Sequence, residues 1–457
     1  MGGSGGTAPK PPKCGDGKVD PGESCDDGNT MDGDSCLGTC LNAAIGMATG
    51  VVSTCAIVAD GRVKCWGKEK YGSLGLGILV DALGDEPGEM GDKLPYVDLG
   101  AGEIAIAINS SRLHTCAILK SDKLKCWGSN EYGGLGLGEL GHRGDAPGEM
   151  GDNLPAVDLG AGQIPIAVEP GTYHTCALLL GGSVKCWGTG YSLGLGDTTD
   201  RGLEPDQMGD NLPAVDLGTG KTAVAISGGA NHTCALLNDG SVKCWGNNNK
   251  GDLGLGDKEW RGEEPNEMGD NLPPVELPPG STVVAITSGS KHNCALLLDG
   301  NVVCWGYNVF GQLGLGDTLD RGDEPGEMGA SLPTVDLGSG KTAVAVFAGN
   351  DNTCALLNDG NVKCWGRNWS GALGLGDMNH RGDDLGEMGD FLPPVDLGSG
   401  LAASALTLSH SYICALFKDG HIKCWGINDE GNLGLGDTEA RGDSPGEMGD
   451  NLPFVKL

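Results

Sequence analysis

The stretch HTCALLNDGSVKCWGNNNKGDLGLGD at residues 232–257 decides the fold, because the 457-residue chain repeats it in recognisable form. The unit returns at intervals of about 60 residues, a period typical of stacked or circular units that cannot bury their apolar faces alone. The repetition therefore predicts a closed or stacked array of similar units. Its first cysteine occurs seven times, as Cys55, Cys116, Cys176, Cys234, Cys294, Cys354 and Cys414.

Each repeat has the periodicity of short strands. In the fourth copy, residues 223–226, 233–237, 242–245 and 275–277 are apolar or β-branched and are bounded by Gly, Asn and Asp. Such runs indicate strands, and no stripe of helical period accompanies them. Four strands in each of seven units predict an all-β, seven-bladed β-propeller of four-stranded blades.

The cysteines support the same register independently. A three-residue loop at 238–240, with Gly240 in the left-handed conformation, closes a hairpin that places Cys234 directly opposite Cys244. In the second copy the left-handed position holds Asp122, one of the few other residues that tolerates positive φ. A directly opposed pair lies within disulfide reach. The repeated offset predicts seven disulfides, one per blade: Cys55–Cys65, Cys116–Cys126, Cys176–Cys186, Cys234–Cys244, Cys294–Cys304, Cys354–Cys364 and Cys414–Cys424.

Cysteine usage predicts the compartment. Of 18 cysteines, the ones outside the blades are Cys14, Cys25, Cys36 and Cys40, so every cysteine can be paired. Paired cysteines are typical of an oxidising environment: the cell surface, the periplasm or the medium. No stretch of the sequence is long and apolar enough to span a bilayer. The Gly- and Pro-rich residues 1–13 are interpreted as a flexible tether left after removal of a leader, as in a bacterial lipoprotein.

The net charge limits the classes of partner that the protein can bind. The chain has 62 acidic and 30 basic residues, which gives −32 at neutral pH. Such a surface repels phosphate backbones, which disfavours nucleic-acid binding, and it equally disfavours attachment to membranes through basic residues.

Residues 43–457 resemble the regulator of chromosome condensation repeat family. The resemblance rests on the His-Thr-Cys-Ala-Leu strand, the Trp-Gly pair and the Gly-x-Leu-Gly segment of each copy. It implies the seven-bladed propeller. The paired cysteines and loops such as GDEPGEMGDKLP at 84–95 look like a bacterial secreted branch of the family. The founding member is a nuclear exchange factor for a small GTPase, but this acidic, cysteine-paired chain departs from it, so exchange activity is not expected.

Residues 14–42 form a separate cysteine-rich module. The segment CGDGKVDPGESCDDGNTMDGDSCLGTC at 14–40 resembles the myxobacterial cysteine-rich repeat, and its four cysteines leave three connectivities open. Oxygen-bearing side chains clustered around glycines suit Ca²⁺, while the alternative is a loop rich in Asx turns. The sequence establishes no cofactor, and calcium is the one candidate. Its predicted ligands are Asp26, Asp27, Asn29, Asp32 and Asp34.

The acidic loops of the blades carry a second, weaker calcium hypothesis. In one of them Arg321 is expected to pair with a neighbouring carboxylate, which would leave the other acids solvated. The Arg-Gly-Asp sequence that begins at Arg321 is interpreted as a structural turn, because the same slot holds other sequences in other repeats.

Histidines and tryptophans divide into structural and surface groups. The seven tryptophans that follow the second blade cysteine are predicted to pack between blades. Trp260 and Trp369 fall outside that register and are predicted to belong to a contact surface. The histidines before the first cysteine are interpreted as hydrogen-bonding spacers at a strand entry, since other polar residues replace them: His114, His174, His232 and His292.

No catalytic set emerges from the motifs. Seven near-identical blades argue against an active site, which needs asymmetric placement of unlike groups. The sequence therefore predicts a non-enzymatic binding scaffold, secreted or at the cell surface, with a protein or surface partner. Two alternatives stay open: a self-assembling, calcium-dependent surface protein, and a lyase or hydrolase built on loop tips.

Overall fold

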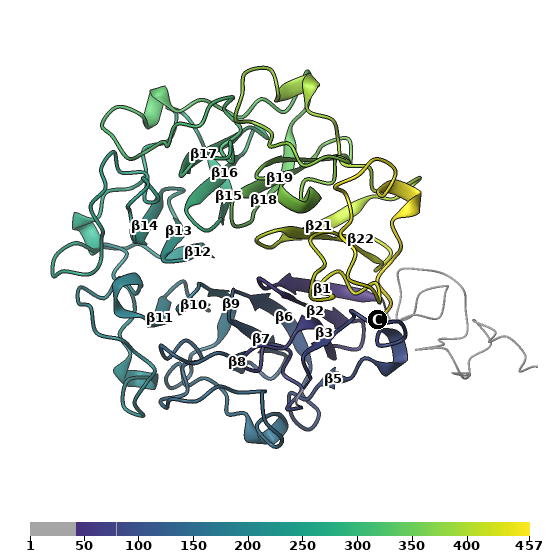
Figure 1. Cartoon of the computed structure of the whole chain (residues 1–457). Coiled ribbons are helices and arrows are strands. Elements are labelled where there is room, and N and C mark those ends of the chain that lie inside the picture. Colours follow the sequence, from purple (N-terminus) through teal and green to yellow (C-terminus); the bar gives the residue numbers. More distant parts are fainter. Residues whose placement is uncertain (1–42, 79) are drawn as a thin grey trace, which may run out of the picture.

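The computed structural model describes residues 43–78 and 80–457, which form a ring of seven β-sheets around a central cavity (Figure 1). The chain is therefore a seven-bladed propeller, as the repeat predicts. Blade 1 contains β1 (Ala44–Thr49), β2 (Ser53–Val58), β3 (Val63–Lys68), β4 (Ala82–Leu83) and β5 (Tyr96–Val97). The cysteine-rich module and its calcium ligands lie outside the described residues, so the calcium site stays a prediction.

The other six blades each contain three regular antiparallel strands that follow one another in the chain. They are β6 (Ala105–Ser110), β7 (His114–Leu119) and β8 (Leu124–Gly128); β9 (Pro165–Pro170), β10 (His174–Leu179) and β11 (Val184–Gly188); β12 (Ala223–Gly228), β13 (His232–Leu237) and β14 (Val242–Gly246); β15 (Val283–Ser288), β16 (His292–Leu297) and β17 (Val302–Gly306); β18 (Ala343–Ala348), β19 (Asn352–Leu357) and β20 (Val362–Gly366); and β21 (Ala403–Leu408), β22 (Tyr412–Phe417) and β23 (Ile422–Gly426).

The predicted fourth strand is present as an outer segment with little ladder. In blade 4 the Val275 amide donates to Val242 O at 2.8 Å, and Arg261 exchanges two backbone hydrogen bonds with Gly246. The ladder stops after Val275 because the next carbonyl, that of Glu276, accepts the Gly329 amide of blade 5. The position that holds Arg-Gly-Asp in several repeats therefore contributes backbone hydrogen bonds to the sheet.

Short 3₁₀ turns occur in the loops between strands. They are η1 (Gly91–Lys93), η2 (Gly151–Asn153), η3 (Gly190–Ser192), η4 (Gly209–Asn211), η5 (Gly269–Asn271), η6 (Gly329–Ser331), η7 (Trp369–Gly371), η8 (Gly389–Phe391) and η9 (Gly449–Asn451).

The hairpin register predicted from the cysteines is confirmed. Cys234 lies directly opposite Cys244, and Gly240 has φ +84°. All seven blade disulfides join the predicted pairs, with Cα atoms 4.1 Å apart. Asp122 has φ +62° in the corresponding turn of blade 2.

The core consists of layers between neighbouring blades. Each middle strand is buried along its whole length, and alternate side chains face opposite neighbours. Cys234 and Leu236 pack toward blade 5, whereas Leu237 and Trp245 pack toward blade 3. The seven repeat tryptophans are fully buried in these layers, as predicted.

One loop carbonyl at most blade junctions receives donors from the next blade. In blade 5, Gln312 O accepts the Trp365 indole N–H at 3.0 Å and the Thr353 hydroxyl at 2.9 Å, both from blade 6. In blade 2, Gly134 O accepts the equivalent pair from Trp187 and Thr175. The Gly-x-Leu-Gly segment of one blade therefore holds the tryptophan of the next.

The histidines extend this contact. His292 Nε2 lies 2.9 Å from Thr353 Oγ1, whose proton is already donated to Gln312 O, so the imidazole donates through Nε2. His114 and His174 contact the threonines of the following blades in the same way. The interpretation of these histidines as hydrogen-bonding spacers is confirmed. They also link one blade to the next.

Buried lysines form a second link, one that the sequence patterns did not reveal. Lys243 is buried and its Nζ donates to Leu217 O of the preceding outer segment at 3.0 Å and to Gly269 O at 2.7 Å. Burial lowers the pKa of Lys243. Blade 5 replaces this lysine with Val303.

The ring closes between blade 7 and blade 1 without an exchanged strand in the described part of the chain. The first repeat begins with an inner-strand segment near residues 45–52 and the last ends with an outer segment at 454–457, which predicts closure by side-chain packing alone. That prediction is wrong, because the Ala44 amide donates to Gly420 O at 2.9 Å and Gly436 N to Gly84 O. Asn432 O accepts the Trp66 indole at 3.1 Å and the Thr54 hydroxyl at 3.0 Å. The first and last blades therefore meet at a junction of the same kind as the internal ones (Figure 1).

We predict that Gly314→Ala destabilises the ring far more than Gly340→Ala. Both glycines have φ +70°, so both variants carry the same backbone strain of about 1–2 kcal/mol. A Cβ on Gly314 would lie 2.8 Å from Trp365 Nε1, whereas a Cβ on Gly340 meets nothing within 4 Å. Urea unfolding should show an extra loss of about 1–3 kcal/mol for Gly314→Ala. Equal losses would show that the tryptophan junction does not limit stability.

We also predict that His292→Asn reduces the acid sensitivity of the fold. Burial lowers the pKa of His292 to about 3, against an ordinary value near 6.5. Its contribution is complete above the unfolded pKa and is lost as the pH falls, because only the unfolded chain takes up the proton. Between pH 7 and pH 5 this costs about 2 kcal/mol, which the asparagine variant should not lose. Urea unfolding at both pH values measures it. An unchanged pH dependence would contradict a neutral, buried imidazole.

Candidate binding face

One face of the ring surrounds the mouth of the central cavity. It is formed by the turns between the first and second strands of each blade and by the loops that follow the third strands. Backbone hydrogen bonds join these turns to these loops; the Asn247 amide, for example, donates to Asn231 O. The cavity has a volume of about 850 Å³ and is lined by the seven first strands and their turns. The hairpins between second and third strands lie on the opposite face.

A continuous chain of backbone bonds stabilises part of this mouth. The amide of Thr172 donates to Ala230 O, that of Ala230 to Ser290 O, and that of Ser290 to Asn350 O. Each bond joins the turn of one blade to the turn of the next. The mouth is therefore held in shape by main chain, which leaves side chains on its rim available for contacts.

Exposed aromatic side chains gather on this face. The residue before the Gly-x-Leu-Gly segment is aromatic in three repeats, and in a fourth a tyrosine replaces the first glycine of the segment; each of these residues contacts a ring from another loop or turn. Tyr132 packs on Tyr173, a cavity-lining residue, with ring centroids 4.7 Å apart. The four aromatic residues are Tyr71, Tyr132, Tyr191 and Phe310.

The densest cluster lies between blades 5 and 6. Phe310 contacts Trp369 edge-on, with centroids 5.5 Å apart, and also contacts His380 at 5.3 Å. The Arg367 guanidinium lies 3.8 Å above the Trp369 ring and donates to His410 Nε2 at 3.1 Å. Half of the Trp369 surface is exposed. We call these five residues the aromatic cluster.

The two predicted contact tryptophans occupy different junctions. Trp369 belongs to the aromatic cluster, whereas Trp260 donates its indole N–H to Asn249 and contacts Tyr191 between blades 3 and 4. Their role as a binding surface stays a prediction. Sequence reasoning missed Phe310 and the tyrosines, although a comparison of the first residue of the Gly-x-Leu-Gly segment and the residue before it in each repeat would have found them.

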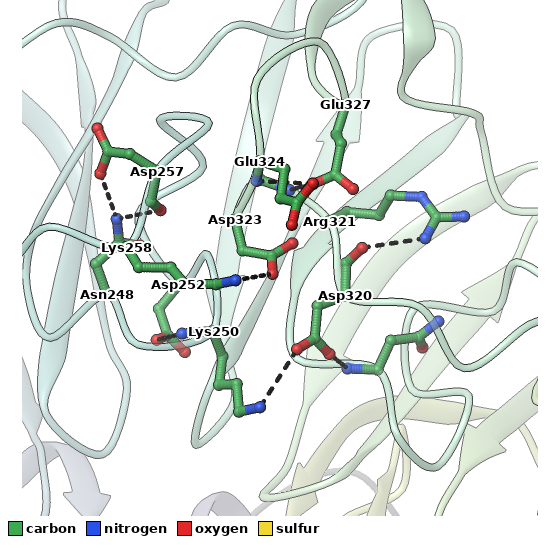
Figure 2. Close-up of polar contacts among 12 residues, drawn as sticks. Asn248, Lys250, Asp252, Asp257, Lys258, Asp320, Arg321, Asp323, Glu324 and Glu327 are labelled. Carbon is green, nitrogen blue, oxygen red and sulfur yellow. Dashed lines mark hydrogen bonds and ion pairs between the residues drawn. The ribbon is translucent and has the colours of Figure 1, made fainter.

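The acidic loops are engaged in local contacts (Figure 2). Asp317 pairs with Arg321 at 2.6 Å, as expected. Asp323 pairs with Lys258 of the neighbouring blade at 2.9 Å. Glu327 accepts the backbone amides of Gly322 and Glu324. Most carboxylates of this loop therefore already have donors, and no group of three or more metal-ligating acids, histidines or cysteines occurs in residues 43–78 and 80–457.

Two protein-family models match parts of the repeat region. The model described as the regulator of chromosome condensation (RCC1) repeat matches residues 105–133, 223–252, 283–312 and 343–371, and a second model of that repeat matches 239–296 and 299–356. Residues 105–133 and 223–371 are thus matched as RCC1 repeats.

Sequence similarity to characterised proteins covers a longer part of the chain than the family models do. The ultraviolet-B receptor UVR8 of Arabidopsis thaliana is 31% identical over 327 residues, covering 70% of this chain and 64% of the receptor. Protein pim1 of Schizosaccharomyces pombe is 28% identical over 359 residues, covering 75% of this chain and 62% of pim1. The chain thus spans less than two thirds of the length of either relative.

Solved structures show the same RCC1 fold. The structure of Prp20p from Saccharomyces cerevisiae, whose description concerns its binding to Gsp1p and histones, has a TM-score of 0.64 at 19% identity and covers 91% of this chain and 88% of its own. Human WBSCR16 has a TM-score of 0.63 at 17% identity, covering 82% of this chain and 87% of its own. At this identity the likeness establishes the fold alone.

Proposed function

We propose that this RCC1-repeat ring is a non-enzymatic binding scaffold that docks a protein partner on the face around the cavity mouth. The observation that carries the proposal is the aromatic cluster, an exposed tryptophan stacked with an arginine and backed by two further rings. Tryptophan, tyrosine and arginine dominate the energy of protein interfaces, usually near their centres. The binding reported in the description of Prp20p supports the choice of a protein partner.

The rigidity of the site supports the same function. Arg367 is held from two sides, because Asp351 accepts from it at 3.1 Å and His410 lies at the same distance. Arg367 is therefore fixed over the Trp369 ring before any partner arrives, which lowers the entropy lost on binding. A scaffold of this kind needs no moving part.

The blade disulfides indicate an oxidising environment, where such bonds form and persist. No helix in the described part of the chain is long and apolar enough to cross a membrane. We place the scaffold outside a bacterial cell, either in the medium or held at the surface by the predicted tether. A calcium-bound cysteine-rich module at residues 14–42 remains part of this proposal.

We predict that Trp369→Ala abolishes partner capture and that Leu298→Ala does not. Leu298 is equally apolar and more exposed, but it lies on a hairpin of the opposite face. Immobilised full-length protein is incubated with extracellular material from the source cells, and retained proteins are compared by mass spectrometry. A protein held by the wild type and by Leu298→Ala, and lost with Trp369→Ala, is expected. Identical retention by all three would contradict docking at the aromatic cluster.

A further inference from the structure

The polar side chains on the wall of the cavity already have partners. The polar residues opposite the first blade cysteines lie on the first strands and bond to neighbouring first strands, whereas Ala48 and Phe347 at the same position are apolar. Ser227 Oγ accepts the Ser288 amide at 2.8 Å, and Thr287 Oγ1 accepts the Ala348 amide at 3.1 Å. The polar groups of the wall are therefore already hydrogen-bonded. Which ligands the cavity prefers then depends on the charged side chains at its mouth.

Two cations from different blades face that mouth. Arg112 lies in the turn between β6 and β7, and Lys291 lies in the turn between β15 and β16; both are exposed and line the cavity. The part of the chain that the structure describes contains no ion pair for either of them, although the protein has about two acids for each base. Every other arginine in residues 43–78 and 80–457 pairs with a carboxylate: Arg62, Arg143, Arg201, Arg261, Arg321, Arg367, Arg381 and Arg441.

The acids near the mouth offset these cations only in part. Glu169 is the one carboxylic acid among the lining residues; its Oε2 accepts from Asn109 at 3.1 Å, and burial raises the pKa of Glu169 to about 7. Asp351 is neutralised by Arg367. Asp252, whose pKa responds to Lys291, is buried, and burial raises its pKa to about 7. The mouth is thus a local positive site on a strongly negative protein.

We propose that the cavity mouth binds a carboxylate-bearing segment of the partner protein, with Arg112 and Lys291 as its ligands from two sides. The volume of about 850 Å³ accommodates several side chains rather than a single small ion. Arginine offers a planar fork that matches a carboxylate, and lysine adds a point charge. This inference rests on the proposed function, since the aromatic cluster joins the mouth through the contact between Arg367 and the lining residue His410.

The test uses the full-length, oxidised chain and two probes, a short peptide of glutamates and a matched peptide of lysines, both capped at their termini. Net attraction favours the lysine peptide, because the protein carries −32. Saturable binding of the glutamate peptide in isothermal titration would therefore require a local site. Its affinity should fall with added salt, since the contacts are between exposed charges.

Arg112→Gln with Lys291→Gln should weaken the glutamate peptide about tenfold or more, the loss expected for two charge-assisted contacts. The matched control is Lys120→Gln with Lys418→Gln, which removes the same charge from exposed hairpins of the opposite face and should bind like the wild type. Melting curves verify that both double variants remain folded.

Absence of saturable binding, equal affinity in the Arg112 and Lys291 variant, or displacement of the glutamate peptide by the lysine peptide would each overturn the inference. These outcomes are separate from the capture experiment. If Trp369→Ala still loses its partner while the glutamate peptide fails to bind, the scaffold stands and the acidic segment does not.

Discussion

The contact between the tryptophan of one blade and the loop carbonyl of the blade before it is the constraint on which this ring depends. The carbonyl lies in the Gly-x-Leu-Gly segment, so that segment must approach the indole closely. At Gly434 an added Cβ would lie 2.7 Å from Trp66 Nε1, and at Gly254 it would lie 2.9 Å from Trp305 Nε1. Both glycines also have positive φ. The Trp-Gly pair and the Gly-x-Leu-Gly segment are thus two halves of one interface, always contributed by different repeats.

Variation among the junctions shows which parts of the contact are essential. Asn293 replaces the threonine in blade 5 and still joins His232 to Asp252 O. Tyr412 replaces the histidine in blade 7 and reaches Ser53 O of blade 1 at 2.7 Å. Trp245 has no partner for its indole N–H in the described structure, yet it remains fully buried. Burial of the indole is common to all seven junctions and its hydrogen bond to six of them, whereas the neighbouring histidine and threonine positions vary.

Much of the fold could be predicted from the sequence because the determining features lie within one repeat. The offset between Cys234 and Cys244, with Gly240 at the turn, sets the hairpin register without knowledge of the rest of the chain. The outer segment could not be foreseen in the same way, because the carbonyl of Glu276 is used by Gly329 of the next blade. Likewise the aromatic cluster joins Phe310 and Trp369 from successive repeats. From the sequence alone, lysines such as Lys243 are expected on the surface. In the ring they are buried, because two backbone carbonyls accept hydrogen bonds from the ammonium group.

Hydrogen exchange of the indole N–H groups, followed by NMR, tests the central role of the tryptophan junctions most directly. The account predicts that Trp66, at the closure between blades 7 and 1, exchanges as slowly as Trp305 and Trp365, because the same contact closes the ring and joins its internal blades. Trp369, half exposed on the face around the cavity mouth, should exchange fast. Fast exchange at Trp66, with slow exchange at Trp305 and Trp365, would contradict the account by showing that the ring opens at its ends.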